Sequence, residues 1–576
     1  MNVPAGASVS QAFATAVDLY EAGDPARALA IAEEVLRRQP HHTGALYMSG
    51  SLLLAQGAAA RALPRLEAAS RQHPDNGEIA ETLAHACHAL QRWPEAVAAY
   101  RAAWQAGRRH PDLLNNLGLA LKESGDVDAA IAAYQEAIRA APHDAMTYNN
   151  LAIALNRKQD YEGAIAAYLR ATELDPANAD VWGNLATLYE QSNLLEEAQA
   201  AVSRGLAVDP AQENLHLIAA RCERRSGALS LAIGRLQEQL ARHDLTPVLR
   251  RSMEFELGRD LDQLGDAESA YPHFAAGNRL TPEVWEMRAG ADAFSRELDD
   301  RLAFFAKGLP ADWPAAAPES RPSPVFLVGF PRSGTTLMDT ILDAHPRISV
   351  LEEMPFLENT VNEIRQLPGG YPGALTTLSS ERIQELRKRY WREVDSSLGP
   401  AARDTLVVDK NPFHSTHAAF IQLLFPGTRF IFALRHPCDV ILSCFMQAFG
   451  FNPVFDNFRS LEDGAGLYRR VMDLWLRYRA LQPLKLHELR YEALVADKER
   501  EIAALLDFLG LTWEEAMDDH TGHARRRGRI YTPSYHQVIR PIYGDAVERW
   551  RRYRQHFGGA LEILGPYVKE FSYSLE

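Results

Sequence analysis

The chain has 576 residues, which is too long for a single hydrophobic core and predicts two or more domains. Its formal net charge of −14 argues against general nucleic-acid binding, and its four cysteines do not make a disulfide framework. No apolar run approaches the roughly 18 residues that a membrane-spanning helix requires. Met1 to Tyr20 lack a basic segment and a continuous apolar core, so no signal peptide is evident. We expect a cytoplasmic protein with no transmembrane segment and no nucleic-acid partner.

The first half of the chain repeats itself with a period of 34 residues. Small residues recur where two helices of a repeat would touch, and aromatic residues recur four positions after a marker alanine. The marker alanines are Ala28, Ala62, Ala96, Ala130, Ala164, Ala198 and Ala232. This pattern is typical of tetratricopeptide repeats, each of which forms two helices. We expect an α-helical superhelix of about eight repeats over residues 9–282, the last one displaced by four residues.

Asparagines recur on the helices that would line the concave groove of this superhelix. They are Asn115, Asn116, Asn149, Asn150 and Asn184. Their amides can hold the backbone of an extended peptide by hydrogen bonds. The alternative is that they only solvate the groove. We favour the first interpretation and expect the groove to bind a protein or peptide.

Residues 283–323 are expected to be a helical hinge followed by a proline-rich linker. From residue 324 to residue 576 the pattern changes to short apolar runs that alternate with amphipathic helices, which predicts a parallel α/β domain. The expected strands are Val325–Val328, Ile348–Leu351, Leu406–Val408, Arg429–Leu434 and Lys485–Leu489. The fold class is therefore α followed by α/β, and ligands should bind at the carboxyl ends of the strands.

A glycine-rich loop, Gly329 to Gly334, connects the first expected strand to a helix that begins at Thr335. Such a loop directs backbone N–H groups and a helix N-terminus at an anion. Two threonines, Thr335 and Thr336, follow the loop where a nucleotide-hydrolysing P-loop has lysine and serine or threonine. We expect a phosphate-binding loop that does not process ATP or GTP, the alternative being a tight strand–helix turn.

A second candidate phosphate site follows the fourth expected strand. Arg435 stands at the end of that strand, and Ser443 lies about two turns into the next helix. An arginine fork with a hydroxyl can hold a phosphate, although a surface ion pair is the alternative interpretation of Arg435. Two phosphate sites on one sheet imply a ligand with phosphates at both ends of a nucleoside.

The segment Phe330-Pro-Arg-Ser-Gly-Thr-Thr-Leu-Met338 resembles the phosphosulfate loop of sulfotransferases that use 3′-phosphoadenosine 5′-phosphosulfate (PAPS). The longer stretch from Arg332 to Glu353, with Leu342-Asp-Ala-His-Pro346, is similar to tyrosylprotein sulfotransferases in particular. The resemblance covers roughly residues 324–560, with gaps, and implies a P-loop-type fold. It implies PAPS as cofactor, 3′,5′-ADP as product and no required metal.

The resemblance also assigns roles to residues. Glu353 matches the general base, Lys410 the catalytic lysine, and Ser534 a serine that helps at the transferring group. The matching cofactor-binding residues are Arg332, Ser333, Gly334, Thr335, Thr336, Arg435, Ser443, Tyr491 and Arg549. Pro355 and Gln447 stand where the family has arginines implicated in acceptor or neighbouring contacts, so this sequence departs from the family where the acceptor would bind.

We therefore expect a sulfotransferase that transfers the sulfuryl group of PAPS to the hydroxyl of a protein or peptide tyrosine. The repeat array would hold the protein partner or substrate. Two alternatives stay open. One is a sulfotransferase for a carbohydrate or small-molecule hydroxyl, and the other is an interaction protein whose second domain binds a nucleotide without turnover.

Overall fold

The computed structural model describes residues 8–284, 291–315, 317, 321–450, 452–519, 522 and 544–576. The chain divides into two compact units, Met1–Ser226 and Gly227–Glu576. Each unit has its own secondary structure and core, as the following paragraphs set out.

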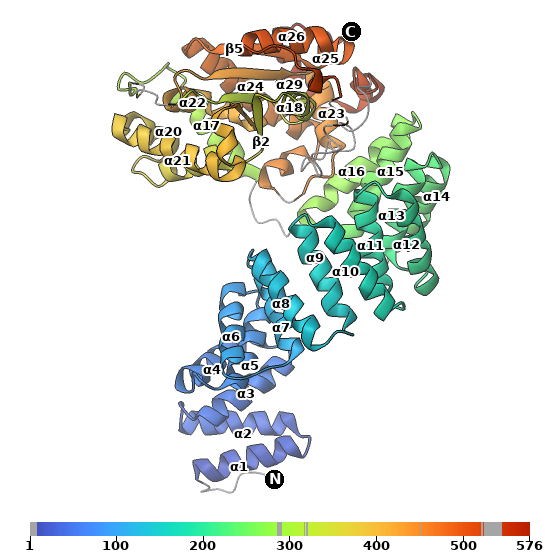
Figure 1. Ribbon diagram of the computed structural model, residues 1–576, viewed down its shortest axis with the longest axis vertical. Coiled ribbons are helices and arrows are strands. Elements are labelled where there is room, and N and C mark those ends of the chain that lie inside the picture. The colour runs from blue at the N-terminus through green and yellow to red at the C-terminus, as the bar shows by residue number, and fades with distance from the viewer. Residues whose placement is uncertain are drawn as a thin grey trace. The chain divides into compact units, whose positions relative to one another are not determined.

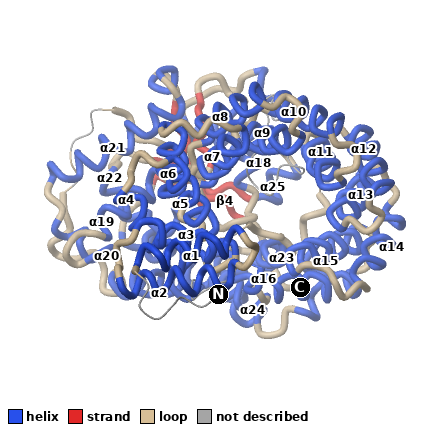
Figure 2. Tube along the Cα trace, turned by 90° about the horizontal axis from the view of Figure 1, so that it is seen from below, coloured by secondary structure: helices blue, strands red, loops and turns tan. Residues whose placement is uncertain are grey.

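The first unit is a stack of helical hairpins, shown in blue to green in Figure 1. Its helices are α1 (Val9–Glu21), α2 (Pro25–Arg38), α3 (Thr43–Ala55), α4 (Ala59–Gln72), α5 (Gly77–Ala89), α6 (Trp93–Gln105), α7 (Pro111–Glu123), α8 (Val127–Ala140), α9 (Ala145–Arg157), α10 (Tyr161–Leu174), α11 (Ala179–Gln191), α12 (Leu195–Val208) and α13 (Glu213–Arg225). Helices α8 to α13 follow a curved path in Figure 2. The helical repeats predicted for the N-terminal part of the chain are present, whereas residues 227–282 of the expected array belong to the second unit.

Packing within the hairpins explains the repeat pattern. The seven marker alanines have no exposed surface, because each lies where the second helix of a repeat meets its neighbours. A Cβ atom on Gly118 would lie 2.6 Å from the ring of Tyr134, so only glycine fits at this helix contact. Tyr100 and Tyr134 are likewise fully buried. Small residues and aromatic residues therefore occupy complementary positions in the core of the array.

The second unit begins with four more helices, α14 (Leu229–Leu240), α15 (Pro247–Gln263), α16 (Ala267–Val284) and α17 (Ala291–Phe304). Buried hydrogen bonds join them to the later part of the same unit. Arg251 donates to the Phe449 carbonyl at 3.0 Å, Asn278 donates to the Phe445 carbonyl at 2.8 Å, and Arg301 donates to Thr416 at 2.9 Å. These helices therefore share a core with the α/β part of the chain.

The α/β part contains one parallel sheet with the strand order β2-β3-β1-β4-β5. The strands are β1 (Val325–Val328), β2 (Ile348–Glu352), β3 (Leu406–Lys410), β4 (Arg429–Leu434) and β5 (Lys485–Arg490). All five expected strands are thus present. The helices around them are α18 (Thr335–Asp343), α19 (Phe356–Arg365), α20 (Gly370–Gly373), α21 (Ser380–Leu398), α22 (Ala418–Leu424), α23 (Pro437–Phe445), α24 (Leu461–Leu481), α25 (Tyr491–Ala496), α26 (Lys498–Leu509) and α29 (Ala560–Glu570).

Shorter 3-10 segments connect these elements: η1 (Ala374–Thr377), η2 (Pro400–Arg403), η3 (Pro412–His417), η4 (Pro453–Phe458), η5 (Glu515–Met517) and η6 (Arg549–His556). Within the described residues, no helix combines the length and apolar character needed to cross a membrane.

Alternation along the strands decides which side chains reach which face of the sheet. Leu327 of β1 packs with Met338 of α18, whereas the ring of Phe326 lies against Tyr390 of α21. The register pairs Leu327 with Lys410 and Phe326 with Asp409. Lys410 therefore projects towards α18, and the preceding aspartate projects to the opposite face.

Candidate functional site

The glycine-rich loop connects β1 to α18 by a backbone that few residues can adopt. Gly334 has φ 94° and Arg332 has φ 69°, both in the left-handed region. A Cβ atom on Gly329 would lie 2.7 Å from the carbonyl oxygen of Ala433 on β4, so the loop passes close to that strand. The loop ends at the N-terminus of α18, whose first N–H groups lack partners within the helix. This geometry suits an anion.

The second candidate phosphate site meets this loop directly. Arg435 follows β4 and donates through Nη1 to the carbonyl of Arg332 at 3.0 Å. Arg332 in turn donates through Nε to Oγ of Ser443 on α23 at 3.1 Å. Arg332, Arg435 and Ser443, which are separated by up to 111 residues in sequence, therefore form one cluster at the carboxyl end of β1 and β4.

An aromatic ring closes this cluster. A Cβ atom on Gly334 would lie 2.6 Å from the Tyr491 ring, and the guanidinium carbon of Arg435 lies 4.7 Å from the centroid of the same ring. Arg435 is 7% exposed, and its Nε atom has no hydrogen-bond partner among the described residues. A buried donor without a partner is costly, and a phosphate oxygen would satisfy it.

Three carboxylates surround the ammonium group of Lys410, which lies at the end of β3. Its Nζ atom is 2.9 Å from Oε1 of Glu353, 3.2 Å from Oδ2 of Asp339 and 3.7 Å from Oε1 of Glu352. Burial disfavours the charged lysine, but the three carboxylates outweigh burial and raise the pKa of Lys410. The lysine side chain is fully buried and is held as a cation.

Glu353 is the most accessible member of this group. Its residue has φ 52°, at the turn that follows β2, and its N–H donates to the Lys410 carbonyl at 2.8 Å. Its side chain is 46% exposed, compared with 9% for Glu352 and 0% for Asp339. Glu353 can therefore reach a molecule that arrives from solvent, and the other two carboxylates face the protein interior.

The remaining sequence-predicted site residues vary in placement. Ser333, Thr335 and Thr336 are buried in the loop and the first turn of α18. Arg549 instead pairs with Asp262 of α15, so its guanidinium is engaged with a helix from the start of the second unit. Ser534 lies outside the described residues.

Sequence reasoning missed Asp339, which is one of the two carboxylates closest to Lys410. The available signal was a carboxylate between Met338 and Ile341, two apolar residues of the same helix that lie in the core.

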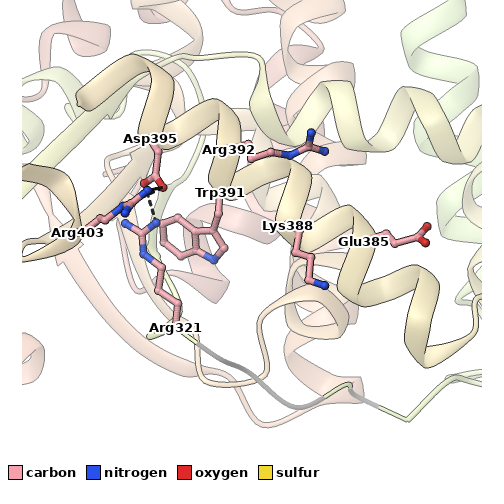
Figure 3. A pocket seen from close by; sticks show the side chains of 7 residues that line it. All are labelled: Arg321, Glu385, Lys388, Trp391, Arg392, Asp395 and Arg403. Atoms are coloured by element: carbon pink, nitrogen blue, oxygen red, sulfur yellow. Dashed lines mark hydrogen bonds and ion pairs between the residues drawn. The ribbon is translucent and has the colours of Figure 1, made fainter. Parts of the chain in front are cut away.

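A separate open hollow of about 780 Å³ lies along α21, as Figure 3 shows. Asp395 pairs there with Arg321 and Arg403, and Arg321 stacks over the ring of Trp391 at 3.7 Å. The hollow is also lined by Glu385, Lys388 and Arg392. Since the residues that line it do not include the loop, Arg435 or Lys410, this hollow is not part of the candidate site.

Comparison with known families separates the chain into two regions. Residues 324–515 match the sulfotransferase family, and tetratricopeptide-repeat models match residues 115–179 as well as 19–84, 53–115 and 155–222. Protein-tyrosine sulfotransferase 2 of Gallus gallus is 25% identical over 246 residues, which cover 39% of this chain and 62% of that protein. An uncharacterized protein of Aquifex aeolicus is 28% identical over 338 residues, covering 55% of this chain and 41% of that protein.

The chain thus spans between 41% and 62% of the length of these two relatives. A crystal structure of YrrB, described as a tetratricopeptide-repeat protein with an unusual peptide-binding site, superposes with a TM-score of 0.29 at 18% identity. The superposed region covers 32% of this chain and 95% of the YrrB chain. From the family matches and the fold, the chain joins a tetratricopeptide-repeat array to a domain of the sulfotransferase family.

Proposed function

We propose that the second domain transfers the sulfuryl group of PAPS to an acceptor hydroxyl, and that the acceptor is a tyrosine of a protein or peptide. The observation that carries this proposal is that two candidate phosphate sites, a carboxylate base and a buried lysine follow the carboxyl ends of neighbouring strands of one sheet. Ligands of parallel sheets bind at this edge.

The residues present fit both ends of the nucleotide. The loop amides up to Gly334, the α18 N-terminus and Arg332 would hold the 5′ end. Arg435 and Ser443 would hold the 3′-phosphate, and the Nε atom of Arg435 supplies a buried donor that still lacks a partner among the described residues. Tyr491 packs against the loop and against Arg435, which fixes both in place.

When bound, PAPS supplies a sulfuryl group that moves to the acceptor oxygen as the bond from sulfur to the 5′-phosphate oxygen breaks, the electron pair remaining on 3′,5′-ADP. Glu353 accepts the proton of the acceptor hydroxyl. Lys410 stabilises the negative charge that develops on the phosphate side. The ion pair of Glu353 with Lys410 at 2.9 Å must therefore open before the two groups can act on their separate partners.

Two features favour a protein or peptide acceptor. The relative from Gallus gallus is a protein-tyrosine sulfotransferase, and the first unit carries the asparagine rows expected of a peptide groove. Asn150 donates to Asn115 at 3.0 Å, and Asn184 donates to Asn149 at 3.0 Å, so the rows are ordered from repeat to repeat. We propose that these rows hold the backbone of an extended segment of the acceptor or partner protein.

Transfer of ³⁵S from labelled PAPS to a panel of acceptors tests the proposal. The panel contains tyrosine peptides, their phenylalanine counterparts, oligosaccharides and small phenols. We expect label on the tyrosine peptides and none on the phenylalanine counterparts. Label on oligosaccharides or small phenols alone would show that the acceptor is one of these and not a peptide tyrosine. Binding of 3′,5′-ADP without transfer to any acceptor would contradict catalysis and favour a nucleotide-binding interaction protein.

A further inference from the structure

Asp339 connects the helix of the phosphate loop to the proposed catalytic lysine. It lies about one turn into α18. The register of β3 with β1 places Lys410 on the face of the sheet that α18 covers. Its Oδ2 atom is 3.2 Å from Nζ of Lys410, and neither side chain has any exposed surface. The pair is therefore a fixed link between α18 and β3.

Asp339 differs from Glu353 in its freedom to move. Glu353 lies on the turn after β2 with nearly half of its side chain exposed, whereas Asp339 is enclosed on a helix. When an acceptor approaches, the exposed carboxylate can turn towards it. The enclosed carboxylate stays beside the lysine. Of these two carboxylates, only Asp339 can accompany Lys410 through the whole reaction.

Once Glu353 turns away, Asp339 is the carboxylate closest to Lys410, at 3.2 Å compared with 3.7 Å for Glu352. A buried ammonium group without a countercharge loses its proton readily, because burial disfavours the charged form. Glu352 and Glu353 also neutralise Lys410, but Glu353 leaves the lysine when it accepts the proton of the acceptor. An ammonium group has three donors, so Lys410 can hold Asp339 and still donate to the leaving phosphate.

We propose that Asp339 is the positioning residue of Lys410, which it anchors as a cation against α18 while Glu353 turns to the acceptor. This proposal rests on the proposed sulfuryl transfer. Asp339 touches neither the acceptor nor the nucleotide in this role, and it acts only through the lysine.

The test compares Asp339→Asn and Asp339→Glu with the wild type in the full chain. In Asp339→Asn, we expect kcat to fall by about 10²-fold, the usual effect of a small misplacement of a catalytic group. The KM for PAPS should stay within a few-fold, because Lys410 acts on charge that develops during transfer. In a plot of kcat against pH, the fall at high pH should begin at a lower pH, because Lys410 loses its proton more readily. Asp339→Glu keeps the charge and should recover part of the lost kcat and move this fall back towards that of the wild type.

A second readout does not depend on activity. NMR titration of lysines labelled with ¹³C at Cε measures the pKa of individual lysines, buried ones included, because the chemical shift changes when the amine loses its proton. We expect the pKa of Lys410 to be lower in Asp339→Asn than in the wild type and to be restored in Asp339→Glu. Asp409→Asn is the matched control, since it removes a buried carboxylate from the adjacent residue on the opposite face of the sheet. It should leave the pKa of Lys410 unchanged.

The outcomes separate the two proposals. An unchanged lysine pKa together with unchanged kcat in Asp339→Asn would overturn the positioning role, and so would lost activity with an unchanged lysine pKa. If Asp339→Asn does not fold, Asp339→Glu decides, because it keeps the charge: a lysine pKa well below that of the wild type in this variant would exclude the anchor. If the wild type binds 3′,5′-ADP and the lysine pKa changes as expected among the variants, but no sulfuryl group is transferred, the proposed function fails and the role in catalysis fails with it.

Discussion

Asp262 and Arg549 form an ion pair that ties α15 to the C-terminal segment of the second unit. The same carboxylate accepts a hydrogen bond from Tyr553 at 2.7 Å and lies 3.3 Å from Arg552. Just before this segment, the carbonyl of Ala546 accepts a hydrogen bond from Arg435 at 2.5 Å. One carboxylate of α15 therefore supports the segment that holds the proposed 3′-phosphate arginine.

We predict that Asp262→Asn weakens both the fold and nucleotide binding. The side chain of Asp262 is 7% exposed, and loss of hydrogen bonds to a charged group costs about 1–3 kcal/mol of unfolding free energy. Chemical denaturation measures this change, and calorimetry should show a higher Kd for 3′,5′-ADP. Glu268→Gln is the matched control, because Glu268 is exposed and lies 3.6 Å from His556 across the same contact. It should change stability by less than about 0.5 kcal/mol. Unchanged nucleotide affinity in Asp262→Asn would refute the supporting role.

We predict that Arg435→Ala raises the Kd for 3′,5′-ADP by an amount that corresponds to about 1–3 kcal/mol, since a hydrogen bond to a charged group is lost. Arg435→Lys should not restore the affinity, because an ammonium group cannot reproduce the guanidinium fork. Arg429→Ala is a control on the same strand, where Arg429 donates at 2.7 Å to the carbonyl of Leu509. This control should bind 3′,5′-ADP as the wild type does. A Kd for 3′,5′-ADP equal to that of the wild type in Arg435→Ala would show that Arg435 does not hold a phosphate.

A third prediction concerns two buried groups on the face of the sheet opposite Lys410. Oδ1 of Asp409 lies 3.5 Å from Nδ1 of His414, and Tyr390 donates to Oδ2 of Asp409 at 2.8 Å. Burial raises the pKa of Asp409 to about 7, although the Tyr390 hydrogen bond offsets part of the rise. Burial lowers the pKa of His414 to about 3, although nearby Glu358 opposes this shift. Neither imidazole nitrogen has a hydrogen-bond partner among the described residues.

These shifts have opposite effects on stability between about pH 4 and 6.5, the ordinary pKa values of the two groups. The folded chain keeps a proton on Asp409 that the unfolded chain loses, so this contribution is present at low pH and is lost as pH rises towards 7. The unfolded chain protonates His414 and the folded chain does not, so that contribution is lost as pH falls. In the wild type, the contributions of Asp409 and His414 to the slope of unfolding free energy against pH therefore largely cancel.

Asp409→Asn should remove only the contribution of Asp409 to the pH dependence of the unfolding free energy. Its unfolding free energy should therefore rise with pH relative to that of the wild type, by up to about 1.4 kcal/mol per pH unit between pH 4 and 6.5. His414→Gln should show the opposite trend. Denaturation with urea at several pH values measures both differences. Profiles that run parallel to that of the wild type would show that neither group has the shifted pKa.

Much of the fold followed from local pattern. The repeat period and the five strands were predictable because alanine spacing and short apolar runs are set by neighbours in sequence. The pairing of Arg332 with Ser443 was within reach because both belong to recognisable motifs. The roles of Asp339 and Asp262 could not be predicted in this way, because their partners come from distant segments of the chain. Only the register of β3 brings Lys410 to Asp339, and only the packing of α15 brings Arg549 to Asp262.

The division of roles between Glu353 and Lys410 is the central claim, and the single-turnover rate of sulfuryl transfer tests it most directly. Glu353→Gln keeps the shape of the side chain and removes its basicity. At saturating PAPS and tyrosine peptide, this variant should transfer about 10²–10⁴-fold more slowly than the wild type. Its Kd for 3′,5′-ADP should stay within a few-fold, because the loop and Arg435 hold the nucleotide. Glu352→Gln, which removes the neighbouring carboxylate, should slow transfer far less. A rate close to that of the wild type in Glu353→Gln would contradict the assignment of the base.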